Sequence, residues 1–257
     1  TSTSFRRLLT KVEPELTISK IASARPIPGE TSTEPVITCI SALTPCSLRY
    51  RERMPVMNTE NLFDTVRAII DRVKTEGDRA VLEYEEKFDK VALTALAVTE
   101  AEQAEAEALV GEELKKAIRL AKRNIETFHA AQRFESKRVE TQPGVTCWQK
   151  AVAIEKVGLY IPGGTAPLFS TVLMLAVPAK IAGCKEIVLC TPPGKDGKVH
   201  PAVLFAAKVA GINRIFKAGG VQAIAAMAYG TESVPKVYKI FGPGNQYVTA
   251  AKQLVSL

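Results

Sequence analysis

The sequence predicts an α/β protein whose first part is helical and whose second part forms a parallel sheet with helices on both faces. One observation is the regular alternation of short apolar segments with helical periodicities after residue 155. Strands that alternate with helices are joined by right-handed crossovers, which place helices over both faces of the sheet. A second observation is that glycine-containing turns follow several of these strands, as in Rossmann-like folds.

The composition is that of a globular protein. Of the 257 residues, 46% are hydrophobic and 24% are charged, which argues against a disordered chain. The net charge is +7, but basic and acidic residues alternate through residues 60–126, and no basic cluster contains interleaved aromatic residues. Nucleic acid is therefore not an expected partner. No apolar run approaches the roughly 20 residues of a membrane-spanning helix, so we expect no membrane segment.

The cysteines indicate reduced thiols rather than disulfides or a zinc ribbon. They are odd in number and include no Cys-x-x-Cys pair. This pattern is typical of cytoplasmic proteins, and we predict that location. The cysteines are Cys39, Cys46, Cys147, Cys184 and Cys190.

Residues 1–57 are predicted to form a loosely ordered arm. They are rich in Ser, Thr and Pro and show no sustained helical or strand periodicity. Arg6 and Arg7 among many hydroxyl residues also leave a transit peptide open, although such peptides avoid acids such as Glu13 and Glu15.

Residues 58–135 are predicted to be helical. The first helix lies behind a capping Asn58 or Thr59 and ends at Gly77. Thr99 and Glu102 form a capping-box pattern before another helix. The apolar positions of the first helix are Leu62, Val66, Ile69, Ile70 and Val73, and those of the second are Val81, Leu82 and Phe88. A later long helix has one apolar stripe made of Leu114, Ala117, Ile118, Ala121, Ile125 and Phe128.

Residues 136–257 are predicted to form the Rossmann-like α/β region. Extended segments between residues 139 and 154 flank a turn at Pro143 and Gly144. Strands are expected at residues 157–161, 187–190, 214–216 and 237–241, and helices at residues 169–182, 200–210 and 221–229 and from about Gln246. Because this last helix has only begun when the sequence ends, we expect an incomplete fold.

Three turns at the ends of these strands are rich in glycine. In an open parallel sheet, ligands bind beyond the carboxyl ends of the strands. Backbone without side chains at the start of a helix can bind a phosphate. Each turn alone is weak evidence, because the first is equally consistent with an ordinary tight connection and Asn245 in the third could simply cap the next helix. The turns are residues 160–167 with Tyr160, Gly163 and Gly164, residues 218–222 with Gln222, and residues 242–245 with Gly242, Gly244 and Asn245.

The usual dinucleotide fingerprint is missing from these turns. No Gly-x-Gly-x-x-Gly is present, and the first glycine turn lacks the acid that normally follows about 20 residues later. A dinucleotide site in this sheet is therefore expected to be atypical.

Longer strings in and around the turns resemble the histidinol dehydrogenase family. The resemblance covers residues 58–257 and does not extend to residues 1–57. The strings are TQPGV at residues 141–145, GLYIPGG at 158–164, FKAGG leading to QAIA at 216–225, and KIFGPGN at 239–245.

The resemblance implies an enzyme of histidine biosynthesis that oxidises L-histidinol to L-histidine through the aldehyde, with two NAD and a bound zinc. It implies that NAD contacts Tyr160, Gln222 and Asn245, so that residues 136–257 would be an NAD-binding region. It also implies a homodimer for the complete enzyme.

The family's zinc ligands and its catalytic Glu-His pair have no counterpart that we can place in this sequence. We therefore assign no catalytic and no metal-binding residue, and expect the chain to be inactive by itself. His129 and His200 are interpreted as solvated or capping residues, and Cys190 as a small buried hydrophobic residue rather than a nucleophile. A non-catalytic nucleotide-binding or interaction module remains the alternative.

Overall fold

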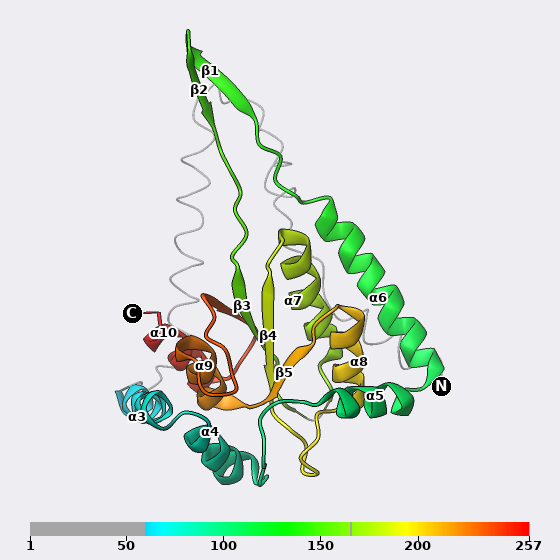
Figure 1. The fold of residues 1–257 in the computed structure, drawn as a ribbon, viewed down its shortest axis with the longest axis vertical. Coiled ribbons are helices and arrows are strands. Elements are labelled where there is room, and N and C mark those ends of the chain that lie inside the picture. The colour runs from blue at the N-terminus through cyan, green and yellow to red at the C-terminus, as the bar shows by residue number, and fades with distance from the viewer. Residues whose placement is uncertain (1–59, 165, 257) are drawn as a thin grey trace, which may run out of the picture. The chain divides into compact units, whose positions relative to one another are not determined.

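The computed structural model describes residues 60–164 and 166–256, and it has the predicted α/β architecture (Figure 1). These residues belong to a compact unit, Asn58–Leu257. The predictions for residues 1–57, including Cys39 and Cys46, and for a cap at Asn58 or Thr59 lie outside the described residues.

A parallel sheet with strand order β5-β4-β3-β6 forms the centre of this unit. Its strands are β3 (Lys156–Tyr160), β4 (Glu186–Thr191), β5 (Arg214–Lys217) and β6 (Lys239–Phe241). The chain proceeds from β3 outward through β4 to β5, and then returns to the opposite side of β3 with β6. The order therefore reverses between β3 and β6, which is the kind of position where open α/β sheets bind ligands.

Both faces of the sheet are buried. Successive side chains of a strand point to opposite faces, so Leu159 and Leu189 belong to one core cluster while Tyr160 and Cys190 belong to the other. The predicted strands are confirmed, except that β6 begins at Lys239 and not at residue 237. The amide of Val237 instead donates to the carbonyl of Met227 at 2.9 Å, so it is bound to α9 rather than to a neighbouring strand.

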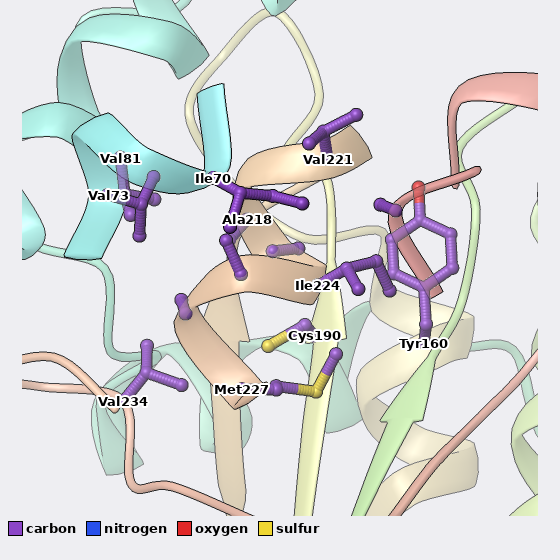
Figure 2. Packing of buried hydrophobic residues seen from close by; sticks show 14 of the residues in the cluster. Ile70, Val73, Val81, Tyr160, Cys190, Ala218, Val221, Ile224, Met227 and Val234 are labelled. Atoms are coloured by element: carbon purple, nitrogen blue, oxygen red, sulfur yellow. The ribbon is translucent and has the colours of Figure 1, made fainter. Parts of the chain in front are cut away.

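On the Tyr160 face, α9 (Gly220–Tyr229) lies against the strands and is covered by α3 (Glu60–Glu76) and α10 (Gln246–Leu254). Ile70 from α3, Ile224 from α9 and Cys190 from β4 lie in the same apolar cluster (Figure 2). The predicted apolar positions of α3 are confirmed, because Val66, Ile69, Ile70 and Val73 are all buried.

On the opposite face, α7 (Phe169–Ala182) and α8 (Pro201–Val209) cover the sheet, and α5 (Glu100–Leu109) and α6 (Glu112–Ala130) pack outside them. The capping box before α5 is confirmed, since the Glu102 amide donates to Thr99 Oγ1 at 3.2 Å and the Thr99 amide to Glu102 Oε2 at 2.7 Å. Ile118 is fully buried, but the assignment of Phe128 to the buried stripe is wrong: it is 63% exposed and packs edge-on against His129 instead.

Between α3 and α5 in the chain, α4 (Asp78–Tyr84) packs against α3 and α9 and continues into a π-helical turn, η2 (Glu85–Asp89). The predicted helix end at Gly77 is confirmed. Gly77 has φ of +57°, and a side chain there would collide with the carboxylate of Glu232, so both the conformation and the space require glycine.

The extended segments predicted around Pro143 and Gly144 form an antiparallel hairpin. Its strands are β1 (Arg138–Gln142) and β2 (Val145–Trp148), and all their residues are exposed. Figure 1 shows the hairpin between the end of α6 and the start of β3. None of the helices in the described part of the chain combines the length and apolar character needed to cross a membrane.

We predict that Leu189→Ala in β4 lowers the free energy of unfolding by about 2–5 kcal/mol, because it leaves a cavity in a fully buried layer. Leu120→Ala is the matched control, since Leu120 on α6 is 48% exposed and its truncation should change stability by no more than about 0.5 kcal/mol. Urea unfolding followed by circular dichroism measures both. Equal losses in the two variants would contradict the assignment of the core.

Candidate functional site

The three glycine turns meet at one cavity of about 910 Å³, beyond the carboxyl ends of the four parallel strands. Helix α3, the turn η2 and the first turn of α10 complete its wall. The strand-end residues of the lining are Tyr160, Pro162, Gly163 and Gly164 at β3, Pro192 and Pro193 after β4, Gly219, Gly220 and Gln222 after β5, and Pro243, Gly244 and Asn245 after β6. The remaining lining residues are Thr65, Ile69, Phe88, Asp89, Val221 and Tyr247.

Tyr160 ends β3 with its ring on the α9 face of the sheet, where it is buried (Figure 2). Its hydroxyl oxygen accepts a hydrogen bond from the Gly220 amide at 3.0 Å, at the start of α9. Burial raises the pKa of Tyr160 to about 12, so the hydroxyl keeps its proton at neutral pH. Tyr160 can therefore donate that proton to a ligand while its oxygen remains bound to Gly220.

Gln222 lies in the first turn of α9 and is almost fully buried. Its Nε2 donates to Oε1 of Glu85 at 2.8 Å, and the same oxygen accepts the Gly219 amide at 2.8 Å. This pairing fixes which end of the amide group faces inward. Oε1 of Gln222 lies beside Gly220 and accepts no hydrogen bond from the described residues, so it is available to a donor on a ligand.

Glu85, in η2, is a site residue that the sequence analysis missed. Its side chain is 0% exposed, and Oε2 has no hydrogen-bond partner among the described residues. Burial, with a smaller contribution from the neighbouring Asp89 carboxylate, raises the pKa of Glu85 to about 7. One signal was present in the sequence: Glu85 follows Val81 by four residues, which places an acid on the buried face of a helix.

Asp89 ends η2 and belongs to the cavity wall, where partial burial raises its pKa. It was not predicted as a site residue either. Helical periodicity gives no reason to select an acid at the end of a helix, and the contact between η2 and the turn after β5 depends on the folded chain.

Asn245 caps α10, as expected for its capping interpretation. Its Oδ1 accepts the Val248 amide at 3.0 Å, and Asn245 also lines the cavity. The capping bond occupies the carbonyl oxygen, so the amide nitrogen is the group that remains for a ligand.

The glycines of the three turns are required for different structural reasons. Gly164 lines the cavity and has nothing within 4 Å of the position of a Cβ, whereas a Cβ on Gly163 would lie 2.7 Å from Pro192. Gly244 lines the cavity but packs against Val248. Gly242 is not among the lining residues: its φ is +137°, and its missing side chain makes room for the backbone of Tyr160.

The histidines and Cys190 have structural roles. Nδ1 of His200 accepts the Ala202 amide at 3.2 Å and caps α8, and the His129 ring pairs with Gln132 Oε1 at 2.9 Å. Cys190 is fully buried, as predicted, and burial raises the pKa of its thiol well above the usual range, which disfavours the reactive thiolate. Among residues 60–164 and 166–256, no group of three His, Cys, Asp or Glu side chains is arranged to hold a metal ion.

Comparison with known proteins assigns the family. The family model described as histidinol dehydrogenase matches residues 52–257, which is most of the chain. The chain belongs to the histidinol dehydrogenase family. The family's name denotes an oxidoreductase.

Relatives named histidinol dehydrogenase include one from Bacteroides fragilis, 80% identical over 205 residues, and one from Escherichia coli K12, 54% identical over 204 residues. These alignments cover 80% and 79% of this chain, but only 48% and 46% of the relatives. The crystal structure of histidinol dehydrogenase from Elizabethkingia anophelis superposes with a TM-score of 0.76 at 53% identity, covering 79% of this chain and 47% of that one. The chain thus spans about half the length of the curated relatives it matches.

We predict that Glu85→Gln flattens the dependence of stability on pH. The pKa of Glu85 is raised from 4.5 to about 7, so between these values the folded state holds a proton that the unfolded state has released. The free energy of unfolding of the wild type therefore falls as the pH rises through this window, by on the order of 3 kcal/mol more than in Glu85→Gln.

Urea unfolding at pH 5, 6, 7 and 8 measures this difference. Glu86→Gln is the control, because it removes an exposed carboxyl from the same turn and should keep the wild-type slope. A Glu85→Gln variant with the same slope as the wild type would show that Glu85 does not bind this proton.

Proposed function

We propose that residues 136–257 are the NAD-binding region of a histidinol dehydrogenase, supported on one side by the helices of residues 58–135 and preceded by the arm of residues 1–57. The complete enzyme would oxidise L-histidinol to L-histidine through the aldehyde in histidine biosynthesis, using two NAD and a zinc ion. It would act in the cytoplasm as a homodimer and without a nucleic-acid partner. The family assignment supports this activity.

One observation carries the proposal for NAD. Tyr160, Gln222 and Asn245 come from three separate strand ends, and all three line the same cavity, where the strand order reverses between β3 and β6. This is the position at which doubly wound sheets bind dinucleotides.

The chemistry of the wall fits a dinucleotide. The cavity is in the size range of small-molecule sites. The uncovered backbone at Gly164 allows a diphosphate to approach closely, before the amino-terminal end of α7. Tyr160 offers a hydroxyl proton, Asn245 an amide nitrogen and Gln222 a carbonyl oxygen. The wall therefore offers both donors and acceptors to sugars and amides.

When bound, NAD would supply a hydride acceptor. The residues of this chain would hold and orient it: the first turn at the diphosphate, and Tyr160, Gln222 and Asn245 at its polar groups. Zinc has no such site in the described part of the chain, which contains no set of side chains that fits the ion.

We predict that Gln222→Ala weakens NAD binding to the 257-residue chain about tenfold, because it removes a buried acceptor from the wall. Calorimetric titration of NAD measures the affinity. Gln253→Ala is the matched control, since Gln253 is an exposed glutamine of α10 away from the cavity. Thermal melting of both variants checks that their folds are retained. An affinity unchanged by Gln222→Ala would place the cofactor elsewhere.

We also predict that the 257-residue chain alone produces no NADH from L-histidinol, with or without added zinc. The described residues provide no metal site, and a metal ion and an acid-base pair together account for many powers of ten in rate. Absorbance at the NADH band measures the reaction. Zinc-dependent NADH production above background would refute the prediction, and NAD binding without turnover would agree with a binding region.

A further inference from the structure

The cavity wall has a distinctive charge distribution. Asp89 is its one carboxylate, and no Lys or Arg belongs to the lining among the described residues. NAD is an anion, so a carboxylate in its site must serve a purpose that outweighs repulsion from the diphosphate. The lining also includes Gly163 and Gly164, whose backbone can receive the diphosphate without a basic side chain.

The local fold holds Asp89 in place beside the turn after β5. Lys90 adopts a left-handed conformation with φ of +61°, which ends η2 directly after Asp89. The Oδ2 atom of Asp89 lies 3.2 Å from the position that a Cβ on Gly219 would occupy. Asp89 forms no ion pair with a described residue, so its charge is not neutralised by a basic side chain.

The neighbouring backbone donors are already occupied. The amide of Gly219 donates to Glu85 and the amide of Gly220 donates to Tyr160, so these amides at the start of α9 are unavailable to a phosphate. Gln222 also has its nitrogen bound to Glu85 and leaves Oε1 for a ligand. Apart from the Tyr160 hydroxyl, this side of the cavity therefore presents acceptors, which suit the hydroxyl groups of a sugar and disfavour a phosphate.

We propose that Asp89 accepts hydrogen bonds from the ribose hydroxyls in the adenosine half of NAD, and that it excludes a 2′-phosphate, so that the site selects NAD over NADP. The inference rests on the proposed NAD site. In other dinucleotide-binding sheets, an acid about 20 residues beyond the first glycine turn performs this role. Here the corresponding carboxylate comes from η2, before the sheet in the sequence.

The test is calorimetric titration of NAD and of NADP into the 257-residue chain at pH 8. We expect the wild type to bind NAD at least tenfold more tightly than NADP. Asp89→Asn should weaken NAD binding several-fold and reduce the ratio of the two affinities at least fivefold. Glu86→Gln removes an exposed carboxyl from the same turn and should leave the ratio unchanged.

Asp89→Ser serves as a second variant without the carboxylate, and circular dichroism shows which variants retain the fold. Discrimination that persists in a folded Asp89 variant overturns the role of Asp89 and leaves the NAD site standing. Equal affinity of the wild type for NAD and NADP also overturns the role of Asp89. A folded wild type that binds neither nucleotide overturns the NAD site itself, and the role of Asp89 with it.

Discussion

Strand β3 pairs with β4 along one edge and with β6 along the other, and the site depends on this central position. Because the pairings are parallel, the chain leaves all four strands at the same end of the sheet. The reversal of strand order between β3 and β6 then leaves room for a cavity between their outgoing turns. The missing side chain of Gly242 is part of this arrangement, since it lets the turn after β6 lie against the backbone of Tyr160.

A second constraint ties the helical part of the chain to the sheet. Oε1 of Glu85 accepts both the amide of Gly219 and the side-chain nitrogen of Gln222, so one buried carboxyl group joins η2 to the start of α9. Isolated burial of a carboxyl group is unfavourable, and these two hydrogen bonds compensate part of that cost. The same contact orients the amide of Gln222 toward the cavity. The buried carboxyl group of Glu85 therefore both joins two parts of the fold and orients a side chain of the cavity wall.

The cavity shows that the glycines of the three turns are needed for different structural reasons. The backbone of Gly164 is exposed to the cavity, whereas Gly163, Gly242 and Gly244 lack a side chain because neighbouring protein atoms occupy that space. Glycines that look equivalent in the turns therefore have different roles. The fingerprint of dinucleotide-binding folds combines such roles in one loop, while here they are distributed over three turns.

The sequence by itself determined the order of helices and strands, the turns after β3, β5 and β6, and the caps at Thr99, His200 and Asn245, because periodicity and capping are local properties. Only the tertiary structure decided that Glu85 and Asp89 belong to the site. Glu85 and its partner Gln222 are 137 residues apart in the sequence, and Asp89 is only four residues closer. No local sequence pattern encodes a contact over such a separation. The exposure of Phe128 was also decided by the tertiary structure. Periodicity defines the apolar face of α6, but it does not show how far along the helix other elements pack against that face.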